Sequence, residues 1–117
     1  MPNKYKCSNG ELVSEATIAK RRSEAYRRMY EGEPHPNCIG CNARAQCTIH
    51  FVPQKYLKGI GKTEYCWKEV NMGPGCFTCN SILESIRGED VKKLLCYDRL
   101  LEVTKLIAPE RYNLMIE

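Results

Sequence analysis

The sequence predicts a small α+β domain in which four cysteines hold a structural zinc ion and helices flank the core. The first observation is a pair of Cys-x-x-Cys motifs, one at Cys38 and Cys41 and one at Cys76 and Cys79, with 34 residues between them. Two such motifs fit two knuckles that close on one tetrahedral zinc ion. The second observation is a short β-branched run between the motifs, and the third is helical periodicity on either side of them.

Length and composition limit the class of protein. A chain of 117 residues forms one domain, or one domain with an appended helix. Such a chain buries a limited core, so a bound metal is expected to contribute to its stability. The first residues lack the apolar stretch of a signal peptide, and no apolar run approaches the length of a membrane span. We therefore expect a cytoplasmic protein without a membrane segment, whose eight cysteines are reduced and available for metal.

The N-terminal segment, residues 1–35, is predicted to be basic and helical. A helix is expected over residues 13–31, where Ser14 is a suitable N-cap and Gly32 with Pro34 ends the helix. The net charge of the whole chain is +4, and part of it is concentrated on this helix, at Lys20, Arg21, Arg22, Arg27 and Arg28. This basic face has two interpretations, a solvated surface or a surface that contacts phosphates.

The central segment, residues 36–88, is the predicted zinc-stapled core. Residues 45–52 are apolar and β-branched, which predicts a strand after the first knuckle. Residues 54–65 carry lysines and glycines and are expected to form an exposed loop. Residues 71–75 are rich in glycine and predict a turn, and residues 81–87 after the second knuckle predict a helix.

The C-terminal segment, residues 89–117, is predicted to contain one long helix that starts at the N-cap Asp90 and ends near Ala108, before Pro109. This helix is apolar on more than one face, so another surface must cover it. The covering surface is either the first helix or a second copy of the chain, which would make a homodimer. A protein-interaction module that docks through this helix is a weaker hypothesis.

Four thiolate ligands suit zinc and leave no open coordination position, so the expected metal is structural. The competing interpretations are a disulfide pair and unrelated buried cysteines. Cys47 and Cys66 add further alternatives, because one of them could replace an assigned ligand, or both could be ordinary buried thiols. Cys7 and Cys96 are expected to bind no metal.

Three motifs in a fixed order resemble those of a known family. They are Ile-His-Phe-Val-Pro-Gln at residues 49–54, Trp-Lys-Glu-Val-Asn-Met at residues 67–72, and Cys-x-x-Cys-Asn at residues 76–80. Together they resemble the His-Asn-His (ββα-metal, or His-Me finger) endonucleases, and the nearest likeness is to the zinc-stabilised phage type with an endonuclease VII-like ending. The resemblance covers about residues 38–86. It implies a ββα-metal core and hydrolysis of DNA, which the enzyme would nick or cut, with branched DNA among the candidate substrates.

The resemblance also implies roles for individual residues. His50 stands in the place of the general base that takes a proton from the attacking water. Asn71 stands in the place of the asparagine that orients this histidine, through its other ring nitrogen or through the adjacent backbone. Asn80 stands in the place of a ligand to the catalytic Mg²⁺ or Mn²⁺. The alternatives for His50 are a satisfied histidine at a strand end and a fourth zinc ligand beside three cysteines.

The sequence departs from the family at Ile49, because many members have a metal-binding aspartate just before the base histidine. Glu84 could replace it, since it follows Asn80 by four residues and lies on the same helix face. The alternative for Glu84 is a surface glutamate paired with Arg87.

Two functional hypotheses follow. The first is a DNA endonuclease, located in the cytoplasm of the host cell if a phage encodes it. The second is a zinc-containing nucleic-acid-binding module of the same fold that lacks catalysis, which Ile49 favours.

Overall fold

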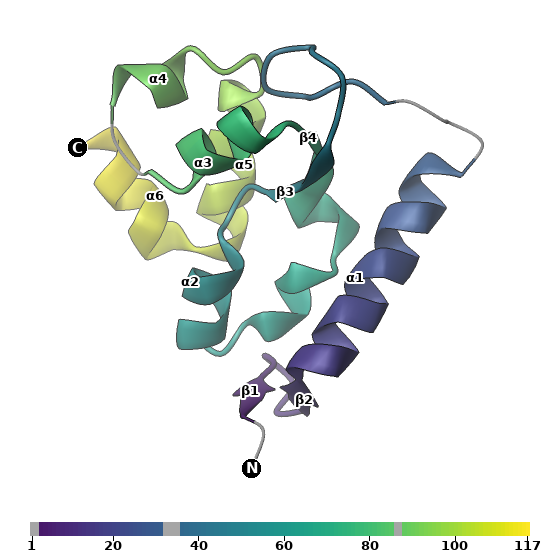
Figure 1. The fold of residues 1–117 in the computed structure, drawn as a ribbon. Coiled ribbons are helices and arrows are strands. Elements are labelled where there is room, and N and C mark those ends of the chain that lie inside the picture. Colours follow the sequence, from purple (N-terminus) through teal and green to yellow (C-terminus); the bar gives the residue numbers. More distant parts are fainter. Residues whose placement is uncertain (1–2, 32–35, 86–87) are drawn as a thin grey trace.

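The computed structural model describes residues 3–31, 36–85 and 88–117, and Figure 1 shows its elements. In chain order these are β1 (Lys4–Lys6), β2 (Leu12–Ser14), α1 (Glu15–Tyr30), β3 (Cys47–His50), α2 (Gln54–Gly59), the 3-10 helices η1 (Thr63–Cys66) and η2 (Glu69–Asn71), β4 (Met72–Gly75), α3 (Phe77–Leu83), α4 (Glu89–Lys92), α5 (Tyr97–Ile107) and α6 (Pro109–Ile116). The described strands form two antiparallel sheets, β1–β2 and β3–β4. The predicted α+β class is therefore confirmed.

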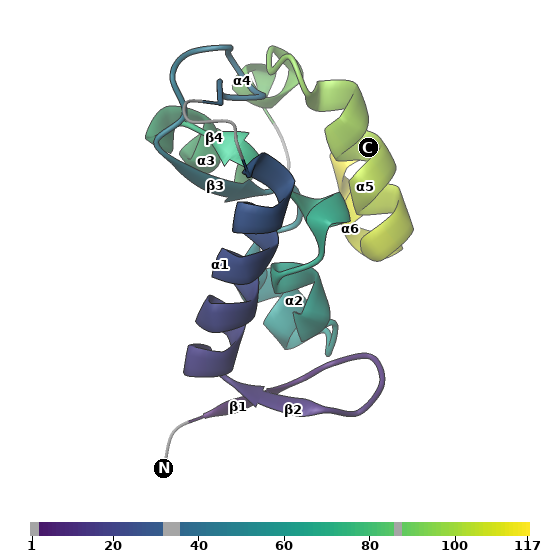
Figure 2. The same ribbon diagram turned by 90° about the vertical axis from the view of Figure 1, so that its right-hand side faces the viewer.

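The N-terminal helix begins where the sequence predicts. The Ser14 hydroxyl accepts a hydrogen bond from the backbone N–H of Thr17 at 3.2 Å, which satisfies one of the unpaired donors of the first turn. Ile18 and Ala25 are buried, while most of the arginines and lysines on α1 stay at least partly exposed. The β1–β2 hairpin, which lies beside the start of α1 in Figure 2, was not predicted, because strands of three residues carry too little periodicity to detect.

The central sheet pairs β3 with β4, and Ile49 lies opposite Gly73. The prediction of a turn at residues 71–75 is wrong, because most of this segment forms β4. Its glycines serve packing rather than reversal of the chain. A Cβ atom at Gly73 would lie 2.7 Å from the Ile39 side chain, and one at Gly75 would overlap the Ile49 side chain. The two glycines thus leave the space that these isoleucines fill, and Ile49 is fully buried as a result.

The prediction of an exposed loop at residues 54–65 is also wrong. This stretch contains α2 and most of η1, and Leu57 and Thr63 are completely buried. The Thr63 hydroxyl donates to the Lys6 carbonyl at 2.7 Å, which ties η1 to the N-terminal hairpin. A helix of six residues with one buried side chain lacks a repeating apolar stripe, so sequence periodicity cannot detect it.

The helix predicted at residues 81–87 starts earlier than expected, because α3 spans Phe77–Leu83 and begins directly after Cys76. Residues 86 and 87 lie outside the described residues. The Cys76 sulfur accepts a hydrogen bond from the Cys79 N–H and so caps the first turn of α3. A cysteine N-cap is uncommon, which is why the sequence analysis placed the helix start too late.

The C-terminal segment is not one long helix. It consists of α4, α5 and α6, and Asp90 lies in the first turn of α4 instead of capping it. Helix α5 ends before Ala108 because Pro109 follows. Helix α6 then folds back against α5, as Figure 1 shows. Lys62 donates a hydrogen bond to the Ile107 carbonyl at 2.5 Å, which satisfies an acceptor at the C-terminal end of α5. The covering of the apolar faces thus comes partly from within the segment.

Within residues 3–31, 36–85 and 88–117, no helix has both the length and the hydrophobicity needed to cross a membrane.

The packing of Ile49 over β4 predicts how a methyl group added at Gly75 changes stability. We expect Gly75→Ala to lower the free energy of unfolding by about 1–3 kcal/mol, because the new methyl group overlaps the Ile49 side chain. Gly59→Ala is the matched control. A Cβ atom at Gly59 meets nothing within 4 Å, and alanine favours the helix there, so this variant should be as stable as the parent or more stable. Urea unfolding followed by circular dichroism measures both changes, and equal stability of the two variants would contradict this packing.

Candidate functional site

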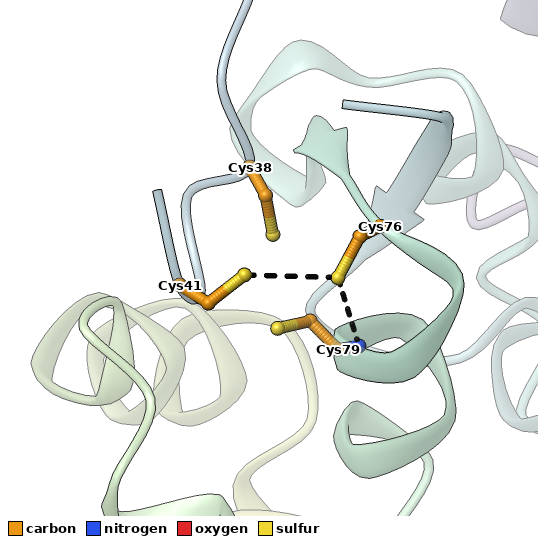
Figure 3. Close-up of side chains that lie close together, drawn as sticks. All are labelled: Cys38, Cys41, Cys76 and Cys79. Atoms are coloured by element: carbon orange, nitrogen blue, oxygen red, sulfur yellow. Dashed lines mark hydrogen bonds between the residues drawn. The ribbon is translucent and has the colours of Figure 1, made fainter. Parts of the chain in front are cut away.

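The four cysteines predicted as zinc ligands lie together in space. Cys38 and Cys41 precede β3, while Cys76 and Cys79 lie at the start of α3, and Figure 3 shows their side chains pointing toward one another. All four sulfur atoms lie within 4.8 Å of one another. The sulfurs of Cys41 and Cys76 are 3.7 Å apart, which is far longer than the roughly 2 Å of a disulfide bond. The spacing instead matches sulfurs at about 2.3 Å from a shared tetrahedral ion. These residues can therefore hold a metal such as zinc.

Backbone groups of both knuckles point at the sulfurs. The Gly40 N–H donates to the Cys38 sulfur at 3.3 Å, and the Cys79 N–H donates to the Cys76 sulfur at 3.4 Å. Such bonds stabilise negative charge on the sulfur atoms. Gly40 is required for the close approach of the knuckles, because a Cβ atom there would lie 2.8 Å from the Cys79 sulfur. The local backbone thus stabilises the negative charge of a thiolate cluster, and the missing side chain of Gly40 leaves room for it.

The thiols of the cluster differ in pKa. The pKa of the Cys76 thiol is lowered to about 7, chiefly because the Cys79 N–H donates to its sulfur. The pKa of Cys79 is raised by burial and by the neighbouring thiols. A metal must displace the remaining protons, so its affinity falls as the pH falls. Because four sulfurs complete a tetrahedral shell, a zinc ion here would be structural and would have no open position for a substrate.

The other cysteines lie outside this cluster. Among the described residues, the group that could hold a metal contains only the four predicted ligands. Cys7, Cys47, Cys66 and Cys96 are free thiols, and the structure contains no disulfide among the described residues. Burial raises the pKa of Cys66 to about 11, which keeps this thiol protonated and unreactive. Neither Cys47 nor Cys66 replaces a predicted ligand.

A cavity of about 610 Å³ lies beside the later residues of α3 and its C-cap. The three residues predicted to act at a catalytic metal site, His50, Asn80 and Glu84, all line it. The described residues that line it are Thr48, His50, Pro53, Gln54, Lys55, Tyr56, Asn80, Glu84 and Arg111. Segments distant in the sequence, namely β3, α2, α3 and α6, therefore meet around a common space.

The imidazole of His50 lies at the end of β3, and only 7% of this residue is exposed. Its Nε2 atom lies 2.8 Å from the carbonyl oxygen of Cys66. A carbonyl oxygen can only accept, so Nε2 carries the proton and Nδ1 keeps its lone pair. Burial lowers the pKa of His50 to about 4, the bond to Cys66 opposes this shift, and the charge of Arg22 lowers the pKa further. His50 is therefore neutral at pH 7, as a proton acceptor must be.

Asn71 is not among the described residues that line the cavity, and its side chain forms no hydrogen bond with the His50 ring. It is fully buried, and its carboxamide accepts from the Val52 N–H at 2.8 Å and donates to the Val52 carbonyl at 3.0 Å and the Tyr65 carbonyl at 3.1 Å. These three bonds all go to backbone groups, and none goes to the His50 ring. Asn71 thus links the segment just after β3 to η1. The Cys66 carbonyl, which also belongs to η1, accepts the hydrogen bond from His50 Nε2.

Asn80 and Glu84 lie four residues apart on α3, with Asn80 half-buried and Glu84 exposed at the C-cap. The alternative pairing of Glu84 with Arg87 falls outside the described residues. Ile49 points away from this cavity, because successive residues of a strand face opposite sides and Ile49 packs against β4. An isoleucine at this position therefore supports the core and brings no ligand to the site.

Two lining residues were missed by the sequence analysis. Thr48 shares the face of β3 with His50, and the two-residue period of a strand could have identified it. Arg111 comes from α6, at the opposite end of the chain, and it is buried with 9% exposure. No local pattern marks an arginine that enters a cavity through tertiary folding.

No protein-family model, curated protein or solved structure that was compared with the chain matches it.

The cluster predicts the metal content of the protein. We expect about one zinc ion per chain in protein purified from zinc-containing medium, because four thiolates complete one tetrahedral shell. Cys79→Ser should lose this zinc and the cooperative thermal transition, whereas Cys47→Ser should keep both. Native mass spectrometry and calorimetry measure the two properties. Zinc retained at full stoichiometry in Cys79→Ser would place the ion elsewhere.

The buried histidine predicts a pH response. Because the pKa of His50 is lowered from 6.5 to about 4, the folded ring stays neutral as the pH falls from 7 to 5. The unfolded chain takes up a proton in this range and the folded chain does not, so His50 lowers folding stability as the pH falls. Nitrogen-15 spectra of the ring, assigned with His50→Gln, should show the Nε2–H tautomer at pH 7. An Nδ1–H tautomer, or titration near the ordinary value of 6.5, would exclude this arrangement.

Proposed function

We propose that this protein is a metal-dependent DNA endonuclease of the zinc-stabilised His-Asn-His type, with β3, β4 and α3 as its ββα-metal core. One observation carries the proposal. His50 and Asn80, which the motifs select, and Glu84, which follows Asn80 by four residues, line one cavity although 33 residues lie between the first and the last. The cysteine cluster supports it further, because Cys76 and Cys79 begin the same helix that carries Asn80 and Glu84. Zinc bound there would fix that helix against β3.

In this proposal His50 is the general base. The Cys66 carbonyl holds the proton on Nε2, so the Nδ1 lone pair accepts a proton from the water that attacks the scissile phosphate. Asn71 keeps the segment after β3 in place, and the bond between Nε2 and the Cys66 carbonyl fixes the ring plane. The lowered pKa of His50 keeps the lone pair available throughout the neutral pH range.

The lining also suits a hard divalent cation. The side chains of Asn80 and Glu84 offer an amide oxygen and a carboxylate, and the hydroxyl of Thr48 lies on the same face of β3 as His50. Oxygen atoms of these kinds are the ligands that Mg²⁺ and Mn²⁺ prefer. Such a cation, when bound, neutralises charge that develops on the phosphate and on the leaving oxygen. Glu84 would thus replace the acidic ligand that is missing at Ile49.

The alternative is a nucleic-acid-binding module of the same fold without catalysis. Ile49 favours it, because a buried alkyl group supplies no ligand at the position of the family's aspartate. The proposed partner is DNA in both cases. Part of the basic surface of α1 is already engaged, since Arg21 pairs with Glu11 at 3.0 Å and Arg28 with Glu69 at 3.8 Å. Phosphate contacts from the rest of this surface would give binding that weakens with salt.

A homodimer through the C-terminal helices is a further proposal. Leu106 is 68% exposed and Ile116 is 55% exposed, so apolar surface remains on α5 and α6 after these helices pack together. In the weaker hypothesis of a protein-interaction module, the same surface would contact the partner protein. We also propose a cytoplasmic location, in the host cell if a phage encodes the chain, because free thiols for zinc require a reducing compartment.

The proposed chemistry predicts nicking of supercoiled DNA in the presence of Mg²⁺ or Mn²⁺. His50→Ala should reduce the rate by roughly 10²- to 10⁴-fold, the usual contribution of a general base, while the zinc content stays unchanged. Gel assays on supercoiled, linear and four-way-junction DNA measure the rate and the preferred substrate.

His35, the other histidine of the chain, lies outside the described residues and provides the matched control, because His35→Ala should cleave like the parent. Equal cleavage by His50→Ala and the parent would exclude His50 as the base. A parent protein that binds DNA but neither nicks it nor binds a second divalent ion would establish the non-catalytic alternative.

A further inference from the structure

Arg111 has an unusual position for an arginine. It belongs to α6, yet it reaches the cavity that contains His50, and it is 9% exposed. Its Nη2 atom donates to the Glu84 carbonyl at 3.1 Å, which satisfies an acceptor at the C-terminal end of α3. Its guanidinium also lies over the Tyr56 ring, 5.2 Å from the ring centroid. Two contacts from different elements therefore hold the guanidinium at the cavity wall.

The charge of Arg111 lacks an anionic partner in the part of the chain that the structure describes. No carboxylate among residues 3–31, 36–85 and 88–117 forms an ion pair with it, whereas Arg21 and Arg28 each have one. Burial lowers the pKa of Arg111, which reflects the cost of holding a cation away from water. An anion that enters the cavity would offset this cost.

The cavity as a whole also favours an anion. Among the described lining residues, Lys55 and Arg111 are cationic, Glu84 is anionic, and His50 is neutral at pH 7. The lining therefore carries a net positive charge. A guanidinium offers five N–H donors in a planar fork that fits two oxygen atoms of one phosphate, and the bond to Glu84 uses one of these donors.

We propose that Arg111 binds a phosphodiester group of a nucleic acid in this cavity and that Lys55 contributes a second, exposed cation. The inference rests on the proposed function for its substrate class, because the same cavity contains the proposed base His50. It assigns a role to the C-terminal segment. The site is complete only when α6 is folded against α5 and delivers Arg111 to the wall formed by α2 and α3.

The test measures DNA binding without added Mg²⁺ or Mn²⁺, so that it does not depend on cleavage. We expect Arg111→Met to weaken the affinity for a labelled duplex about tenfold and to reduce the slope of log K against log salt by about 1, as loss of one phosphate contact requires. Arg99→Met is the matched control. Arg99 also lies over an aromatic ring, that of Phe51 at 5.0 Å, and it belongs to α5, but it does not line the cavity. Its loss should change the affinity about twofold or less.

A second measurement covers the case in which Arg111→Met fails to fold. The Nε–H signal of Arg111 in the parent protein, assigned with Arg111→Lys, should shift and saturate when the duplex is added. Inorganic phosphate should shift the same signal only at much higher concentration. An unchanged signal with DNA, or equal affinities and slopes for folded Arg111→Met and Arg99→Met, would overturn the inference. A response to phosphate but not to DNA would also overturn it, because the cavity would then take a free anion.

The two proposals fail in different ways. Parent protein that binds DNA through Arg111 but never cleaves it would remove the proposed hydrolysis and leave the phosphate site intact. Parent protein that nicks DNA while the Arg111 signal stays unchanged would do the reverse.

Discussion

The structure depends on the meeting of four cysteine sulfurs from two segments of the chain. One pair precedes β3 and the other begins α3, so a metal held between them joins the segment that enters β3 to the segment that leaves β4, at one end of the sheet. Strands of four residues and a helix of seven residues are too short to be stable alone. Metal–sulfur bonds would supply the missing stability, and they would fix the direction of α3. Because Asn80 and Glu84 lie on this helix, the geometry of the cavity follows from the geometry of the cluster.

Buried polar contacts surround the histidine and the segment that follows it. The carboxamide of Asn71 forms hydrogen bonds with backbone groups of Val52 and Tyr65. The Cys66 carbonyl accepts a hydrogen bond from the His50 ring. Buried polar groups are stable only when they find such partners, so the ring has one favourable orientation. The same burial keeps the ring neutral. Structural stability and the proposed role as a base therefore require the same arrangement.

The C-terminal helices do more than cover the core. The break at Ala108 turns α6 back along α5, and Arg111 then reaches the Glu84 carbonyl and the Tyr56 ring. A single straight helix could not bring this guanidinium to the cavity. The packing of this segment is thus part of the proposed site.

The sequence by itself determined the features that depend on residue type at close spacing. The two cysteine motifs predicted the metal ligands, Ser14 predicted the start of α1, and the order of the His50 and Asn80 motifs predicted two residues of one cavity. Only the tertiary structure decided the rest, because those features depend on contacts between distant segments. Gly73 and Gly75 predict a turn when the sequence is considered alone. In the folded chain they lie in β4, where the side chains of Ile39 and Ile49 fill the space beside them. Arg111 carries no local signal at all, since its position exists only after α6 has folded onto the core.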